Sequence, residues 1–410
     1  MLLNRIWISL FVISMAMACG KAFIFHDLNI FKVIVEGLFE TVKGGFEMVI
    51  SLTGALCLWM GMMNIGEKAG IVNILSKLVS PLFSRLFPEI PKGHPAAGAI
   101  MLNYSANMLG LDNAATPIGL KAMKFLQELN PSKDTASNAQ IMFLVLNTSG
   151  LTIIPVSIIA YRSSSGSANP TEVFMPILFA TYCSTITGLI LVSIKQKLNL
   201  FNPVVFAYIG GMSALIFGLL TWCIYHPESI TTVSDFVGNF VLFGTIVSFI
   251  VLGAIRKVNI YESFVEGAKG GFEIAIGILP FVIAILAAVS VFRSSGAMQA
   301  LFDGIGYILT AIGVTSLAFI DALPVAFMKP FSGPGARAMM LEVFQSKGVD
   351  SFAGKLASTF QGCTDTTFYI LAVYFGSVGI TRIRYAAKLG LAADFVGIIA
   401  SIFLAYLFYK

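Results

Sequence analysis

Apolar runs of about 20 residues recur along the whole chain, separated by shorter polar or amphipathic segments. A run of this length can cross the hydrocarbon core of a bilayer as a helix. We therefore predict an all-α integral membrane protein with about nine transmembrane helices. The predicted spans are Ile6–Phe25, Phe46–Asn64, Ile141–Tyr161, Val173–Ile194, Val204–Tyr225, Phe236–Ile255, Phe272–Phe292, Leu356–Gly376 and Ala386–Phe408.

Three other stretches place apolar residues at helical spacing beside charged residues. They are Leu28–Val42, Ala69–Phe87 and Gly296–Ile312. This pattern is typical of a helix that lies in the plane of the membrane interface, with its apolar face towards the lipid. Ordinary loops outside the membrane are the alternative interpretation.

Two segments among the apolar runs are rich in Asn, Thr, Ser, Gly and Pro. They are Met101–Met123 and Asp321–Met340. Backbone groups in hydrocarbon must be hydrogen-bonded, so an interrupted polar segment there must be buried in protein or line a wet cavity. We predict two re-entrant hairpins, with tips at Leu109–Ile118 and Lys329–Arg337.

Two of the predicted spans carry polar residues and glycine at mid-length. One contains Leu146–Thr152, with Pro155 beyond it, and the other contains Phe360–Thr367. Discontinuous helices of this kind, together with hairpins, form substrate and ion sites in secondary transporters. The pattern predicts two broken helices. When the two segments are aligned with each other without a gap, Asn147 corresponds to Gln361.

Composition supports a membrane protein and argues against other classes. The chain is 57% hydrophobic and only 11% charged, and its net charge of +5 comes from scattered basic residues. We therefore expect the lipid bilayer as a partner and no nucleic acid. The sequence shows no Ser/His/Asp order, zinc-ligand spacing or P-loop, so we predict no enzyme, no metal site and no cofactor. A homo-oligomer is left open.

The N-terminus allows two interpretations. Arg5, an apolar run and the small residues before Cys19 resemble a lipoprotein signal. We favour a retained first helix, because the second half of the chain has an equivalent helix.

An internal repeat divides the chain. Lys43–Glu47 (KGGFE) recurs letter for letter as Lys269–Glu273, and similar elements follow each copy in the same order. We predict a first repeat at 1–197, a linker transmembrane helix at 198–230 and a second repeat at 231–410. Because a single span links the halves, the second repeat should be inverted.

Basic residues set the orientation in the membrane. The segment His226–Asp235 has no Lys or Arg, whereas Lys195 and Lys197 lie before the linker helix and Arg256 follows the next span. The positive-inside rule then predicts a cytoplasmic N-terminus in the cell (inner) membrane, with His226–Asp235 and the C-terminus outside.

The polar residues at the hairpin tips and helix breaks form the predicted substrate site. Inverted repeats bring these elements together near the membrane midplane, where helix N-termini favour anionic groups. Asp365 either holds a coupling Na⁺ or H⁺ or pairs with Lys329 or Arg337. Asp394, in the last span, is a weaker candidate than Asp365 for a functional acidic residue. The predicted substrate-binding residues are Asn113, Thr116, Asn147, Ser149, Thr152, Ser332, Gly333, Gln361, Thr364 and Asp365.

The motifs resemble a known family. Asn113–Pro117 (NAATP) and Lys121–Met123 are similar to spore maturation protein A, whereas Ser332–Arg337 (SGPGAR) and Thr364–Tyr369 (TDTTFY) are similar to spore maturation protein B. Both halves resemble the nucleoside-recognition gate domain, which ferrous-iron transporters also contain. The element order per half is similar to that of concentrative nucleoside transporters.

Three functional hypotheses follow. The first is a transporter for a small polar solute, such as a nucleoside or an anionic metabolite. The second is a non-transporting scaffold or gate that acts with a partner in envelope or spore maturation. The third, which the resemblance implies, is ferrous-iron passage.

Overall fold

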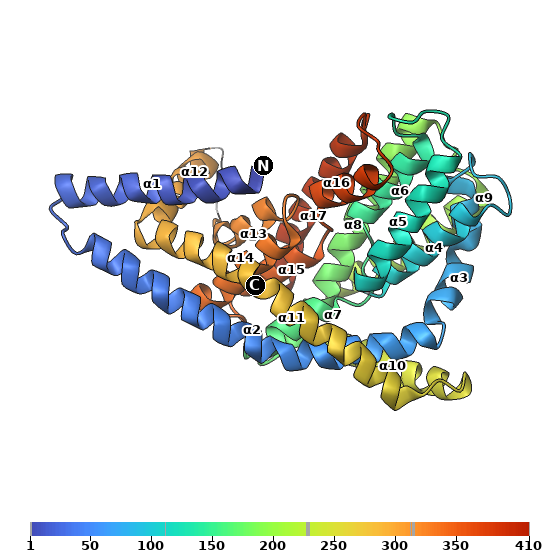
Figure 1. The fold of residues 1–410 in the computed structure, drawn as a ribbon, viewed down its shortest axis with the longest axis horizontal. Helices are drawn as coiled ribbons and strands as arrows, with labels where there is room; N and C mark the ends of the chain where they lie inside the picture. Colours follow the sequence, from blue (N-terminus) through green and yellow to red (C-terminus); the bar gives the residue numbers. More distant parts are fainter. Residues whose placement is uncertain (1, 111, 227–229, 312, 314–315, 410) are drawn as a thin grey trace.

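The structure is a computed structural model, and it describes residues 2–110, 112–226, 230–311, 313 and 316–409. The described residues form helices and connecting loops, and none of them belongs to a β-sheet (Figure 1). The helices up to the linker are α1 (Leu2–Ile24), α2 (Ile30–Lys68), α3 (Ile71–Leu86), α4 (Pro95–Met108), α5 (Asp112–Glu128), α6 (Asn138–Thr148), α7 (Val156–Ser164), η1 (Pro170–Val173), α8 (Phe174–Gln196) and the linker α9 (Pro203–Tyr225).

The second part of the chain repeats this order. Its helices are α10 (Ile230–Ile255), α11 (Ile260–Ser294), α12 (Ala297–Ala311), η3 (Ile320–Ala322), α13 (Leu323–Met328), α14 (Gly333–Lys347), α15 (Phe352–Gly362), α16 (Thr367–Ser377) and α17 (Ala386–Phe408). The α-helices before α9 and those after it thus follow a similar order of long, short and broken elements, whereas the short helices η1 and η3 occupy different places in that order.

The longest helices correct one prediction. We expected a separate interfacial helix at Leu28–Val42 followed by a span from Phe46, but α2 runs through both as one helix. In the second half, α11 begins at Ile260, well before the predicted start of its span at Phe272. The glycines of the KGGFE motif therefore lie inside helices. Charges at helical spacing, such as Lys43 and Glu47 at 3.9 Å, stay on the exposed face and are compatible with an uninterrupted helix. The other two amphipathic stretches form helices as predicted, α3 and α12.

The repeated glycines allow α2 and α11 to pack closely and antiparallel (Figure 1). A Cβ added to Gly271 would lie 2.6 Å from the carbonyl oxygen of Leu56, and one added to Gly45 would lie 2.5 Å from Leu286. Larger side chains at these positions would hinder the approach. Small residues likewise allow close approach at other crossings of membrane helices. The same motif therefore supplies the contact in both directions.

Both predicted hairpins are present as helix–turn–helix units, α4–α5 and α13–α14. Their turns are tighter than predicted, because α5 already begins at Asp112 and α14 at Gly333. Pro117 consequently lies inside α5 and does not interrupt it at the tip. With 14 residues, α4 is roughly 21 Å long, which is shorter than the hydrocarbon core of a bilayer.

Both predicted broken helices are also present. The first is interrupted between α6 and α7, and the second between α15 and α16. Hydrogen bonds tie the breaks to neighbouring elements: the backbone N–H of Asp365 donates to Thr148 O at 2.7 Å, and that of Phe368 donates to Pro330 O at 2.9 Å. The freed backbone groups are thus satisfied inside the protein, as a membrane interior requires.

Loops from the two halves meet in pairs. Arg382, before α17, donates its N–H to the carbonyl oxygen of Asp134, before α6, at 2.9 Å. In the other pair, the buried Arg162 at the end of α7 forms an ion pair of 2.7 Å with Asp350, which lies before α15. Each loop contact thus joins one segment of each half.

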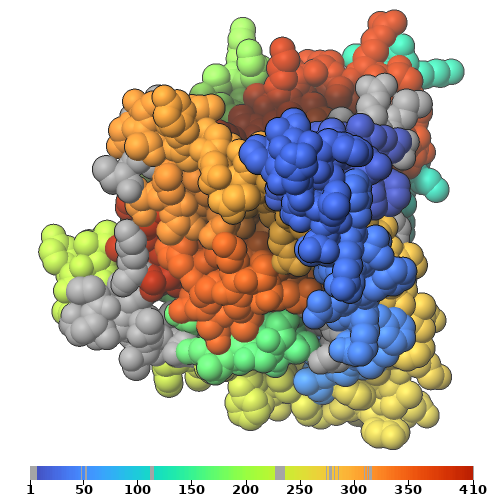
Figure 2. Space-filling view, turned by 90° about the vertical axis from the view of Figure 1, so that its left-hand side faces the viewer, coloured from blue at the N-terminus to red at the C-terminus, as the bar shows by residue number. Residues whose placement is uncertain are grey.

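Five helices within the described residues are long and apolar enough to cross a membrane, or up to six if a bent pair in α11–α12 counts as one span. These five match the predicted first, fourth, fifth, sixth and ninth spans. Large apolar side chains are exposed on several of them, for example Phe206 on α9 and Phe240 on α10, as lipid-facing helices require. Figure 2 shows the end of the molecule where α1 and the first turns of α2, in blue, lie at the surface beside the orange segments of the second half. The count of nine spans stays a prediction.

Candidate functional site

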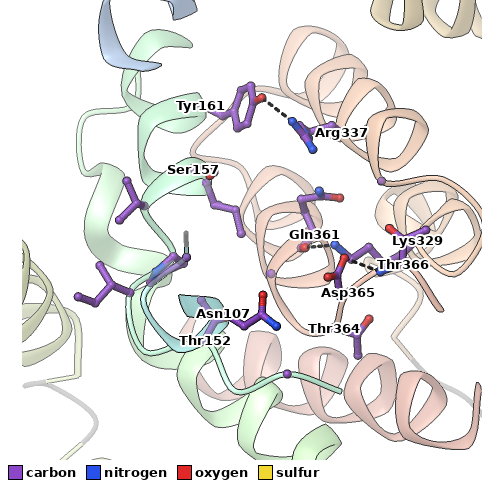
Figure 3. Close-up of a pocket in the computed structure, with 18 of the residues that line it drawn as sticks. Asn107, Thr152, Ser157, Tyr161, Lys329, Arg337, Gln361, Thr364, Asp365 and Thr366 are labelled. Carbon is purple, nitrogen blue, oxygen red and sulfur yellow. Dashed lines mark hydrogen bonds between the residues drawn. The ribbon is translucent and has the colours of Figure 1, made fainter. Parts of the chain in front are cut away.

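A pocket of about 120 Å³ lies between the two helix breaks, and residues of both hairpins also line it (Figure 3). The lining comes from both halves: α4, α6, α7 and the first break contribute residues from one half, and Lys329, α14, α15 and the second break contribute residues from the other. Six predicted site residues line it: Asn147, Thr152, Gly333, Gln361, Thr364 and Asp365.

The break between α15 and α16 supplies the acidic side of the pocket. The Asp365 side chain reaches the pocket, and its Oδ1 accepts a hydrogen bond from the backbone N–H of Thr366 at 2.6 Å. Within the described part of the chain, the buried atoms Gln361 Oε1 and Thr364 Oγ1 have no hydrogen-bond partner. Buried polar atoms without a partner are costly, so Gln361 Oε1 is available to a donor from a ligand, whereas Thr364 lies within hydrogen-bonding reach of Asp394.

Two basic side chains lie on the hairpin side of the pocket. Lys329, which is buried, follows α13, and its Nζ donates to Gln361 O at 2.7 Å. Arg337, one turn into α14, donates from Nη1 to the hydroxyl of Tyr161 at 3.2 Å (Figure 3). The pocket therefore holds positive charge from one hairpin and negative charge from the neighbouring break.

Amide groups line the opposite wall. Asn107, near the end of α4, donates from Nδ2 to Asn147 Oδ1 at 2.8 Å, and Asn147 Nδ2 donates to Phe143 O at 2.9 Å. These bonds fix the Asn147 side chain between the first hairpin and the first break. Thr152 lies in the break itself, beside the pocket.

Three other predicted residues, Ser332, Ser149 and Thr116, lie outside the lining. Ser332 caps α14 by accepting from Gly335 N at 3.0 Å, and Ser149 is buried against Gly188 of α8 while donating to Val145 O. Thr116 lies in α5 and hydrogen-bonds with Tyr374. Asn113 belongs to the first turn of α5, and its side chain lies outside the described residues.

Several side chains that line the pocket were not among the predicted substrate-binding residues. Two of them, Lys329 and Arg337, were considered only as partners of Asp365, although charged residues inside a predicted hairpin are themselves functional candidates. Asn107 was visible as a polar residue before the first tip. Tyr161 and Ser157 carry no signal in the sequence, because only the fold of α7 brings them to the pocket.

The described residues contain no group of three or more His, Cys, Asp or Glu side chains that could hold a metal ion. The pocket instead combines amides, hydroxyls, one carboxylate and two basic groups. Such a set suits a polar organic ligand that hydrogen-bonds and carries charge.

Comparisons with known proteins agree with this architecture. The family described as "Gate: Nucleoside recognition" matches residues 49–165, which include the first hairpin and the first broken helix. The chain is 39% identical over 190 residues to spore maturation protein A of Bacillus subtilis, covering 46% of this chain and 93% of that protein. It is 44% identical over 164 residues to spore maturation protein B of the same organism, covering 40% of this chain and 90% of that protein. The chain belongs to the spore maturation protein family.

For this spore maturation family member, the family match and the site overlap. Asn107, Asn147, Thr152 and Tyr161 fall within the residues matched to the nucleoside-recognition family, and all four line the pocket. The protein is therefore a multi-pass membrane protein of that family, with a polar pocket inside the matched region.

Proposed function

We propose that this protein transports a small polar solute that carries a negative charge, and that the pocket between the two helix breaks is the binding site. The observation that carries the proposal is the joint lining of one pocket by both hairpins and both broken helices. In secondary transporters, discontinuous helices from two repeats form the substrate site in this way.

The charges favour an anionic group on the solute. Lys329 and Arg337 approach from the second hairpin, and α14 begins at Gly333, so its first N–H groups add a partial positive charge near the pocket. An ammonium, amine or hydroxyl elsewhere on the solute would meet Asp365, Gln361 Oε1 and the amides of the opposite wall. A nucleoside-like or anionic metabolite fits this arrangement of donors and acceptors.

We further propose that the two halves are inverted repeats that move against each other. The antiparallel pairing of α2 with α11 and the two pairs of loop contacts support this arrangement. The first half would correspond to spore maturation protein A and the second to protein B. A coupling Na⁺ or H⁺ and an inner-membrane location with a cytoplasmic N-terminus belong to the same proposal.

The test is ligand binding by the purified protein, followed by exchange of the ligand in proteoliposomes. Thermal unfolding in detergent would be measured with nucleosides, nucleobases, dipicolinate and inorganic phosphate as probes. We expect at least one anionic probe to raise the unfolding temperature of the wild-type protein and not that of Arg337→Gln. Arg85→Gln is the matched control, because Arg85 is exposed at the end of α3 and far in sequence from the site.

The outcome separates transport from the scaffold hypothesis. A stabilising probe that also exchanges across the proteoliposome membrane supports the proposal. If no probe stabilises the protein and none exchanges, the pocket is not a transport site, and a role through a partner protein becomes the better explanation.

A further inference from the structure

Asp394 is a buried acidic residue in the middle of α17, outside the pocket lining. Only 1% of its surface is exposed, and its Oδ2 accepts a hydrogen bond of 2.6 Å from the hydroxyl of Thr367. Thr367 is the first residue of α16, directly after the second break. A carboxyl group of α17 is therefore held against the broken helix that supplies part of the pocket.

Two glycines on α17 bring Asp394 to this position. A Cβ added to Gly390, one turn before Asp394, would lie 3.0 Å from Thr367 Cγ2 and 3.3 Å from Thr148 Oγ1. A Cβ added to Gly397, one turn after it, would lie 3.0 Å from Thr364 Cγ2. Because both glycines lack a side chain, α17 packs directly on the helix breaks of both halves.

Two buried polar atoms at this contact, Asp394 Oδ1 and Thr364 Oγ1, have no hydrogen-bond partner among the other groups of the described chain. The two side chains lie within hydrogen-bonding reach of each other. A carboxylate buried with so few donors is unfavourable, and a proton on its oxygen removes the charge and supplies a donor.

We propose that Asp394 is a proton-binding site, connected to the solute pocket through the hydroxyl of Thr364. Water in the pocket delivers the proton to Oδ1, and the new O–H group donates to Thr364 Oγ1. On release, the O–H bond breaks and the proton returns to water in the pocket. Asp394 is then a carboxylate again. Thr364 is shared, because it lines the pocket on one side and contacts Asp394 on the other.

A proton fits the geometry better than a metal cation does. A cation at this place would need several oxygen ligands, whereas the described residues contain no group of three or more His, Cys, Asp or Glu side chains that could hold one. The charged or titratable groups that interact with the carboxyl are Lys329, Asp365 and Cys363. Thr148 of α6 and Ser184 of α8 also pack against this face of α17, and their hydroxyls donate to Val145 O and Ala393 O.

The coupling of this proton to solute movement rests on the proposed transport function, but the protonation itself does not. Infrared difference spectra of the purified protein between acidic and alkaline buffer would detect the C=O stretch of a protonated carboxylic acid without any solute. We expect this band in the wild-type protein, its loss in Asp394→Asn, and its retention in Asp365→Asn. Thr364→Val should keep the band and shift its position, because the hydroxyl that accepts the hydrogen bond is removed.

Several outcomes would overturn the inference. A band that persists in Asp394→Asn, or one that disappears only in Asp365→Asn, would assign the proton to another group. A wild-type unfolding temperature that responds to Na⁺ but not to pH would identify a sodium site instead. If Asp394→Asn does not fold, the test rests on Thr364→Val. A C=O band at the same position in Thr364→Val as in the wild-type protein would count against the proposed link. Failure of every solute probe would refute transport while leaving these spectra interpretable.

Discussion

Gly271 of α11 approaches Leu56 of α2 so closely that an added Cβ would lie 2.6 Å from the Leu56 carbonyl oxygen. Gly45, at the same position of the first copy of the motif, lies against the side chain of Leu286 in α11. Both copies of the motif therefore lie at the contact between α2 and α11, and the closest approach of two backbones is at Gly271.

The first prediction compares neighbouring glycines of the motif. Gly271→Ala should lower the free energy of unfolding by about 1–3 kcal/mol, because the methyl group meets backbone atoms of α2. Gly270→Ala is the control, since nothing lies within 4 Å of the added Cβ and alanine favours a helix by about 1 kcal/mol over glycine. Thermal or denaturant unfolding in detergent measures both. Equal effects of the two substitutions would contradict the close crossing.

The second prediction concerns Asp365. Asp365→Asn keeps the shape of the side chain, so a role in binding solute or a coupling ion predicts a folded protein that has lost binding or ion dependence. A structural pair with a basic neighbour predicts lower thermal stability instead, because removing one member of a buried pair costs about 3–5 kcal/mol. Binding and unfolding are measured on the same preparation. If neither changes, Asp365 is not at the centre of the site.

The third prediction uses the ion pair between the halves. Asp350→Asn leaves the buried Arg162 without its carboxylate, and we expect a loss of about 1–3 kcal/mol, which allows for the 37% exposure of Asp350. Asp321→Asn is the matched control: Asp321 is also 37% exposed, but its partner Lys347 is 47% exposed. Surface pairs of this kind contribute about 0–1 kcal/mol.

The effect of Asp350→Asn should depend on pH. Partial burial raises the pKa of the Asp350 carboxyl, but hydrogen bonds from Ser167 and Ala168 and the charge of Arg162 outweigh it, so the pKa lies below its usual value. A lowered pKa stabilises the folded protein above the ordinary pKa of about 4, and this stabilisation is lost as the pH falls through the lowered value. The difference in unfolding temperature between wild type and Asp350→Asn should therefore shrink on acidification. A constant difference would contradict the charge interaction.

The fourth prediction is the topology of the first hairpin. Lys92 precedes α4 and Lys133 follows α5, and both are exposed. If α4 and α5 form a re-entrant unit, single cysteines at these two positions, in a chain whose five native cysteines have been replaced, should react with an impermeant reagent from the same side. Reaction from opposite sides would mean that the hairpin crosses the membrane.

The fifth prediction is the inversion of the halves. Reporter fusions after Lys197 and after Tyr225 bracket α9, so they should report opposite compartments, with the first one cytoplasmic. If both fusions report the same compartment, α9 does not cross the membrane, and the second half is not inverted relative to the first.

The apolar and polar patterns of the sequence determined much of the architecture. Runs of about 20 apolar residues marked the five long apolar helices, and the polar clusters at Leu146–Thr152 and Phe360–Thr367 marked the breaks. These features are local, because a helix in hydrocarbon must hydrogen-bond its own backbone and must be apolar along its length. The repeated motif likewise predicted two similar halves, and this division stays a prediction.

Only the tertiary structure decided what the glycines and charges do. Gly44 and Gly45 resemble a helix break in the sequence, yet they lie inside α2, because packing against α11 outweighs their weak helix propensity. Tyr161 and Arg337 become neighbours across 176 residues, a separation at which no local pattern can act. The sequence by itself therefore determined the long apolar helices and the two polar breaks, but not the continuity of α2. The tertiary structure decided which polar side chains share a pocket, since that depends on how two distant repeats pack.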